Sequence, residues 1–317
     1  MTRVDTRLLN TVIYLYASED DAKKGSRTGG SGFLLSVASG TIPGRKHTFA
    51  VTNQHVAARG KVVRMNKTGG GTGILPLEPD TWVDHPAGDD LAVAYVPPDA
   101  LRGFDYRTIH EKMLLTKQDV EELQAIAPGE DVCMVGRFIT HEGREQNRPT
   151  VRFGNVSQMP WEPLYQGERG HWQESFLVEM RSHGAYSGSP VFNIYDPHII
   201  RTGAPGDILE KTFLVGVDWG HIPTLNPVLE DDGVTRARGG WLSQGHSGQS
   251  GVVPAWRLRD LLDSEPIATM RAAHDEELAR RIASGRVDGE EADVSLEAVL
   301  QEDERTPTYR PSPPASG

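Results

Sequence analysis

The sequence predicts an all-β protein built from two successive β modules, and three observations support this prediction. Short apolar runs rich in β-branched and aromatic residues recur from residue 11 to 96 and again from 131 to 217. Gly-rich or polar turns separate these runs, which is typical of β-sandwiches and barrels. Between the two series, apolar residues in 116–126 are three apart, the spacing of one helix face. We therefore expect two β domains joined by a helical connector.

The elements follow from these patterns in chain order. In the first module, the Gly-rich segments 23–32 and 67–73 cannot pack a core and are expected to be surface loops. A helix is expected over 254–263, with proline near its first turn. The expected strands are 11–17, 32–36, 48–52 and 91–96 in the first module, and 131–138, 150–157, 175–180, 190–193 and 212–217 in the second. The expected domains are an N-terminal module over 8–112, a connector over 113–129, a C-terminal module with its closing helix over 130–263 and a tail over 264–317.

The tail differs from the rest of the chain in composition. It holds twelve acidic residues and six arginines, and it ends in a stretch rich in proline and serine. A helix is compatible with 268–282, whereas the remainder is too polar to bury a core and is expected to be disordered.

Charge and composition exclude several classes of function. The formal net charge of −11 opposes binding to a phosphate backbone, so no nucleic-acid partner is expected. The single cysteine forbids an intramolecular disulfide, which favours a reducing compartment. No run approaches the roughly 20 apolar residues that a membrane span needs, and the N-terminal apolar run lacks a cleavage site. These observations predict a soluble, cytoplasmic protein without a membrane partner.

A candidate nucleophile lies in the segment SHGAYSGSPVF, residues 182–192. Ser187 stands between two expected strands, with Gly184 and Gly188 close to it on either side. A nucleophilic hydroxyl needs such a tight turn, with backbone N–H groups converging beside it. A glycine-rich surface turn would show the same local pattern, so this segment alone leaves both interpretations open.

A candidate general base follows the expected strand 48–52. His55 lies just past that strand in TNQHVAA, where rigid strands can aim its side chain. Imidazole is a natural general base near neutral pH. A structural or surface histidine is the competing interpretation.

A candidate carboxylate precedes the expected strand 91–96. Asp90 can accept the second imidazole N–H and so orient the ring. The competing interpretation is that Asp89 and Asp90 cap a turn before the strand. Asp89 is also the alternative for the catalytic role.

Together, these motifs resemble the trypsin/chymotrypsin-like serine proteases, especially the bacterial members without disulfides. The likeness covers about residues 10–262, with His, Asp and Ser in the family's order. The similar segments are GSGF at 30–33, TNQHV at 52–56, DDLAV at 89–93, GEDVCMVGRF at 129–138, TVRFGNVS at 150–157 and LVGVDWG at 214–220.

The resemblance implies two packed six-stranded antiparallel β-barrels and a serine endopeptidase, a hydrolase acting through an acyl-enzyme intermediate. His55, Asp90 and Ser187 would form the catalytic triad, and the N–H groups of Ser187 and Ala185, beside Gly184, would form the oxyanion hole. A protein or peptide substrate would pair with the edge strand at Asp218, Trp219 and Gly220. Arg181 would reach the specificity pocket and favour an acidic side chain, or else lie on the surface. Tyr186 and His221 would shape the pocket rim.

Two positions depart from the family pattern. Ala185 stands where the family usually has glycine, which predicts a shifted turn or a poorly formed resting oxyanion hole. Asp218 stands where serine is common near the catalytic aspartate, so it must point away, pair with a cation or share a proton.

The sequence shows no metal site and no cofactor motif. The alternative to an active enzyme is a catalytically weak or inactive peptide-binding module of the same fold. An intracellular protease would also need control, so we expect regulation by a protein partner, by substrate or by the tail.

Overall fold

The N-terminal module is a single β-sheet of eight strands. The structure, a computed structural model, describes residues 4–26, 28–60, 62–77, 80–122, 124–137, 145–180, 186–194, 212–231, 234–237 and 239–284. The strand order is β5-β4-β1-β2-β3-β7-β6, with β8 pairing parallel to β2 and all other pairs antiparallel. The bounds are β1 Val12–Tyr16, β2 Thr28–Ala38, β3 Lys46–Thr52, β4 Val62–Asn66, β5 Thr72–Leu75, β6 Trp82–Asp84, β7 Ala92–Val96 and β8 Ile109–His110.

This sheet differs from the six-stranded barrel that the resemblance implied. The short strands β5 and β6 lie at the two edges of the sheet, and they do not pair with each other to close a barrel. Parts of both Gly-rich segments expected to be surface loops, 23–32 and 67–73, also belong to the sheet. Strand β2 starts at Thr28 and pairs with β1, and β5 starts at Thr72 and pairs with β4. In the described residues, the first module is therefore an open, half-barrel sheet.

The C-terminal module is a closed six-stranded barrel, as expected. Its order is β10-β13-β16-β15-β14-β9, and a separate two-stranded hairpin, β11–β12, lies between β10 and β13 in the chain. The bounds are β9 Asp131–Gly136, β10 Thr150–Gln158, β11 Leu164–Gln166, β12 His171–Gln173, β13 Phe176–Glu179, β14 Pro190–Asn193, β15 Leu214–Pro227 and β16 Leu242–Pro254.

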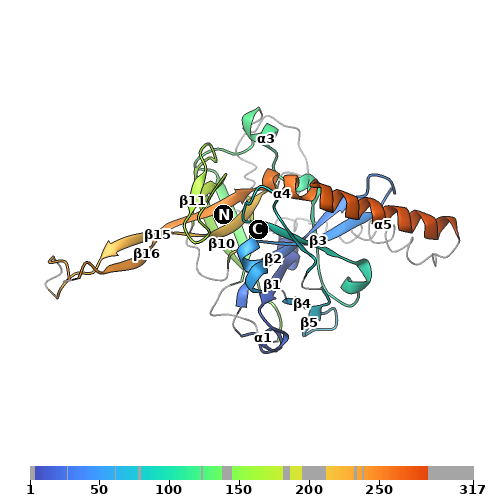
Figure 1. The fold of residues 1–317 in the computed structure, drawn as a ribbon, viewed down its shortest axis with the longest axis horizontal. Coiled ribbons are helices and arrows are strands. Elements are labelled where there is room, and N and C mark those ends of the chain that lie inside the picture. Colours follow the sequence, from blue (N-terminus) through green and yellow to red (C-terminus); the bar gives the residue numbers. More distant parts are fainter. Residues whose placement is uncertain are drawn as a thin grey trace, which may run out of the picture.

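The pairing of β15 with β16 continues well beyond the barrel. It reaches Pro227 opposite Leu242, so the two strands leave the barrel as a long ribbon (Figure 1). The prediction of a strand over 212–217 stopped about ten residues short, because prolines and polar residues interrupt the apolar pattern. Leu225, Trp241 and Leu242 are exposed on this ribbon.

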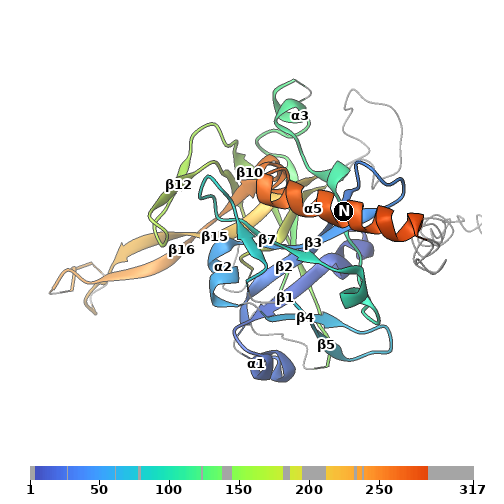
Figure 2. The ribbon, with the colours of Figure 1, turned by 45° about the vertical axis from the view of Figure 1, so that its right-hand side comes forward.

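Short helices link the sheets, and two helices end the described chain. The expected connector helix over 116–126 is only five residues long, because the chain leaves the helical path and Gln124 has a φ of 48°. The expected closing helix is present as α4, and α5 follows it across the N-terminal sheet (Figure 2). The bounds are η1 Thr6–Thr11, α1 Glu19–Lys24, α2 Gln54–Arg59, η2 Pro98–Leu101, η3 Glu111–Met113, α3 Lys117–Glu121, α4 Ala255–Leu262 and α5 Glu265–Ala283. In the part of the chain described here, no helix is both long and apolar enough to cross a membrane.

One hydrophobic core joins the two modules. Tyr14 and Phe33 of the first sheet belong to the same buried cluster as Val135, Tyr186 and Trp256 of the second half. Because these apolar surfaces leave water together, each module stabilises the other.

Candidate active site

The start of α2 places His55 beside Asp90. Strand β3 ends at Thr52 and α2 begins at Gln54, so His55 lies in the first turn of the helix. The first N–H groups of a helix have no partner within it. The Asp90 carboxylate accepts the N–H of His55 at 3.0 Å, and the Asn53 side chain donates to the Asp90 carbonyl at 2.8 Å. The helix start and the aspartate loop are thereby locked together.

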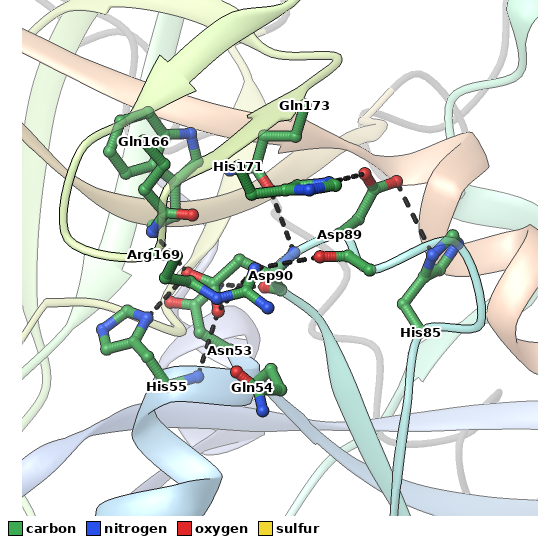
Figure 3. A network of polar contacts seen from close by, with 12 residues as sticks. Asn53, Gln54, His55, His85, Asp89, Asp90, Gln166, Arg169, His171 and Gln173 are labelled. Carbon is green, nitrogen blue, oxygen red and sulfur yellow. Dashed lines mark hydrogen bonds and ion pairs between the residues drawn. The ribbon is translucent and has the colours of Figure 1, made fainter.

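The side chains of His55 and Asp90 form a short hydrogen bond. His55 Nδ1 lies 2.6 Å from Asp90 Oδ2 (Figure 3). The Asp90 side chain is fully buried, whereas 18% of the His55 side chain is exposed. The ring is thus held on one side and accessible on the other.

The ionisation of Asp90 determines which ring nitrogen carries the proton. Burial alone raises the pKa of Asp90, but hydrogen bonds from the His55 ring, Gln166 and the His55 backbone prevail and bring it below the ordinary 3.8. Asp90 is therefore ionised at neutral pH and can only accept hydrogen bonds. The proton of the neutral ring then resides on Nδ1, which leaves Nε2 as an acceptor.

Asp89, the competing carboxylate, faces a different partner. Its Oδ2 accepts a hydrogen bond from Arg257 of α4 at 2.5 Å. His85 and His171 lie 3.7 Å from its two oxygens. Asp89 therefore fastens α4 to the aspartate loop, and Asp90 alone of the pair contacts His55.

Ser187 is placed by contacts between the two modules. Its carbonyl accepts the N–H of Ser31 in β2 at 2.9 Å, and the next residue, Gly188, donates to the Asp218 carbonyl at 2.8 Å. Gly188 has a φ of +88°, and a Cβ there would lie 2.0 Å from the Ser31 carbonyl oxygen. Only glycine fits this close approach.

Gly30 shows that Ser187 and the His55 helix converge on one end of β2. A Cβ at Gly30 would lie 2.8 Å from the Val56 side chain and 2.9 Å from the Ser187 carbonyl oxygen. Residues from three separate segments therefore meet there. The Ser187 hydroxyl donates to the Trp219 carbonyl at 3.3 Å in this structure, and it makes no hydrogen bond to His55.

The segment from Asp218 to Gly220 lies beside Ser187. The buried Asp218 side chain accepts a hydrogen bond from the Ser250 hydroxyl, and Trp219 Nε1 donates to Ser175 at 3.1 Å. A Cβ at Gly220 would lie 3.9 Å from Ser187 Oγ. Pairing of β15 with β14 ends at Val217, whereas pairing with β16 continues on the other side.

Three predicted site residues, Arg181, Gly184 and Ala185, lie outside the described residues. Tyr186 does not shape a rim, because it is fully buried and its hydroxyl pairs with Thr150. His221 stacks on His246 of the ribbon, with ring centroids 4.9 Å apart. Among the described residues, no three His, Cys, Asp or Glu side chains gather as metal ligands.

Sequence reasoning missed the β11–β12 hairpin, whose glutamines contact Asp90. Gln166 donates to Asp90 Oδ2 at 2.8 Å, and Gln173 accepts the N–H of Asp90 at 2.9 Å. The available signal was the alternation of aromatic and polar residues in LYQ and HWQ around the turn GERG.

No family model matches the chain, and no curated protein matches it. Among solved structures, it is similar to the MamO protease domain from Magnetospirillum magneticum, at 16% identity and a TM-score of 0.48, over 81% of this chain and 98% of that one. It is also similar to the HtrA-type protease AlgW with a tripeptide, at 17% identity and a TM-score of 0.42, over 81% of this chain and 61% of that one.

A third similar structure is an inactive form of the Rv3671c protease from M. tuberculosis, at 13% identity and a TM-score of 0.43, over 80% of this chain and 88% of that one. All three structures are of proteases, and AlgW is a protease of the HtrA type. At these identities the likeness concerns the fold alone.

Proposed function

We propose that this protein is a serine endopeptidase in which Ser187 is the nucleophile, His55 the general base and Asp90 the residue that orients His55. The observation that carries the proposal is the 2.6 Å contact between His55 and a buried, ionised Asp90. Ser187 is bonded to β2 at the point where the helix of His55 also packs. The structural histidine His47 also pairs with a buried carboxylate but is itself fully buried, whereas 18% of the His55 side chain stays exposed beside its partner.

The chemistry is acyl transfer. The Ser187 hydroxyl leaves the Trp219 carbonyl by rotation of its side chain and presents its proton to Nε2 of His55. Its oxygen then attacks the peptide carbonyl, while Asp90 stabilises the imidazolium. His55 returns the proton to the leaving amine, and water hydrolyses the acyl-enzyme in a second cycle. A protein or peptide substrate would pair with β15 beyond Asp218, whose own backbone N–H and carbonyl are bonded to Ser189 and Gly188.

The test compares two serines of the same segment. Ser187→Ala is expected to lower kcat/KM for peptide cleavage by about 10⁴-fold or more, and to abolish covalent labelling by a fluorophosphonate. Ser189→Ala is the matched control, because that hydroxyl is buried and has no hydrogen-bond partner among the described residues. Equal cleavage by wild type and Ser187→Ala would contradict the proposal.

The alternative is a peptide-binding module that is weakly active or inactive. The hydrogen bond from Ser187 to Trp219 favours it, since the nucleophile is not engaged by its base at rest. The two functions differ in fluorophosphonate labelling. A folded wild-type chain that binds peptides yet leaves Ser187 unlabelled at every pH would establish the alternative.

Control by a protein partner or by the tail belongs to the same proposal. Its support is the resting hydrogen bond of Ser187, which must break before catalysis. A partner or substrate that favours the rotated hydroxyl would increase the rate of labelling.

A further inference from the structure

The β11–β12 hairpin has two distinct faces. Its register pairs Leu164 with Gln173, Tyr165 with Trp172 and Gln166 with His171. Tyr165 and Trp172 are exposed, with their rings 5.1 Å apart. Gln166 and Gln173 lie on the opposite face and are buried, as the alternation of side chains along a strand requires.

The buried face holds the loop that carries Asp90. Gln166 donates to the Asp90 carboxylate, and Gln173 accepts the Asp90 N–H (Figure 3). At the hairpin turn, Arg169 donates to the Gly88 carbonyl at 3.1 Å and lies 3.7 Å from Asp90 Oδ1. The hairpin belongs to the second module and Asp90 to the first, so these contacts cross between modules.

Gln166 donates to the same oxygen that His55 uses. Asp90 Oδ2 accepts from His55 Nδ1 and from Gln166 Nε2. An ionised carboxylate offers no donor, so the Gln166 amide must present its NH₂ group there. Two donors on one oxygen fix the rotation of the carboxylate, and with it the plane of the imidazole.

Stability alone does not account for these glutamines. Within the described part of the chain, their second amide atoms, Gln166 Oε1 and Gln173 Nε2, are buried without a hydrogen-bond partner. A buried unpaired polar atom destabilises a fold, and an apolar side chain of the same shape would avoid this cost. The amides are therefore better explained by the contact that they make with Asp90.

We propose that Gln166 is a positioning residue for catalysis, and that Gln173 seats the β11–β12 hairpin on Asp90 so that Gln166 reaches the carboxylate. This inference rests on the proposed function of His55, Asp90 and Ser187. His55 is then correctly oriented only when the β11–β12 hairpin is packed against the loop of Asp90.

The first test is Gln166→Met, which keeps the length of the side chain and removes its amide. We expect kcat to fall about 10- to 100-fold, as for loss of a hydrogen bond that orients an active-site ligand, with KM within about twofold. Glu168→Gln is the control, because Glu168 is exposed at the turn of the same hairpin. An unchanged kcat in Gln166→Met, with the control also unchanged, would overturn the inference.

The second test is Gln166→Glu, which changes the contact reversibly with pH. The introduced carboxyl is buried beside an ionised Asp90, so its pKa is raised. Its protonated form donates to Asp90 as the amide does, whereas its ionised form repels Asp90. The ratio of variant to wild-type kcat should therefore be near one at low pH and fall as pH rises. A ratio independent of pH would refute a positioning role, and this variant also decides the case if Gln166→Met does not fold.

A third measurement separates this inference from the proposed function. We expect the proton of the short hydrogen bond between His55 and Asp90 to give a far-downfield NMR signal, which can be recorded without turnover. If wild type is inactive but the signal shifts in Gln166→Met and not in Glu168→Gln, the positioning contact stands and the protease proposal fails. If wild type is active and the signal is identical in all three proteins, the protease proposal stands and the positioning role fails.

Discussion

Gly188 joins the candidate nucleophile to both β modules. Its missing side chain leaves room for the carbonyl of Ser31 in the first sheet, and its N–H donates to Asp218 of the second barrel. Its φ of +88° also falls in the left-handed region that favours glycine. Glycine is therefore favoured at this position both by the backbone conformation and by the lack of space for a side chain.

Comparison of alanine variants at Gly188 and Gly129 separates the cost of the backbone conformation from the cost of the steric clash. Gly129 has a similar φ of +90°, but among the described residues no atom lies within 4 Å of the point that a Cβ would occupy there. Gly129→Ala should lower the free energy of unfolding by about 1–2 kcal/mol from backbone strain alone. Gly188→Ala should cost at least about 2 kcal/mol more, because the new methyl group clashes with backbone.

Urea denaturation of both glycine variants measures this difference. The same samples should also show slower labelling of Ser187 in Gly188→Ala, since the turn must shift. Equal stability losses in the two variants would mean that the clash relaxes without cost.

At the scale of elements, α5 is attached to the first sheet by a polar contact. Asp275 accepts hydrogen bonds from Ser39 at 2.7 Å and Thr41 at 2.9 Å, in the turn between β2 and β3, and lies 3.0 Å from His47 Nε2. Burial lowers the pKa of His47 in spite of Asp275, so this histidine is neutral at neutral pH. Ile267 near the helix start is fully buried.

Removal of the Asp275 carboxylate should loosen α5 while both β modules stay folded. Asp275→Ala is expected to lower the free energy of unfolding by about 1–3 kcal/mol, because two hydroxyl groups lose their acceptor. Amide hydrogen exchange should become faster in residues 265–283 and stay unchanged in the C-terminal barrel. The exposed neighbour variant Glu276→Ala serves as control, and exchange that is equally slow in both variants would contradict the anchoring role.

At the scale of the whole molecule, the two modules share one core. Cys133 of β9 lies in that cluster and is 2% exposed. Burial raises the pKa of its thiol to about 12. The thiolate, which is the reactive form, is therefore both scarce and covered in the folded chain.

Cys133 should report global unfolding. We expect a thiol reagent at about pH 8 to react with the native protein only through the unfolded state, and with the urea-unfolded chain at once. The free energy obtained from the labelling rate should equal that from tryptophan fluorescence, since a shared core unfolds as one unit. A much smaller value from labelling would show that β9 opens independently of the rest.

Local patterns in the sequence predicted many of the elements. Short apolar runs located β1, β3, β7 and β9, and the proline before Ala255 marked the start of α4. Strand and turn propensities act over a few neighbouring residues, so such patterns can be read directly. The same local signals selected His55, Asp90 and Ser187 as candidates.

The open sheet and the long ribbon could not be read in this way. Closure of a barrel depends on which distant strands pair. Nothing in the sequences of β5 and β6 shows that these two strands lie at the edges of the sheet. The length of β15 is set by pairing with β16, since Pro223 and Pro227 interrupt its local strand pattern.

By itself, the sequence determined two successive β modules, their candidate chemical groups and the order of those groups in the chain. Only the tertiary structure decided that Asp90 rather than Asp89 meets His55, and that Gln166, 76 residues further along, completes the carboxylate's contacts. Adjacent aspartates look alike in a sequence, and their roles differ because Arg257 attracts one while a helix start and a remote hairpin hold the other. The direction of a side chain depends on its partners, and here those partners come from segments far apart in the chain.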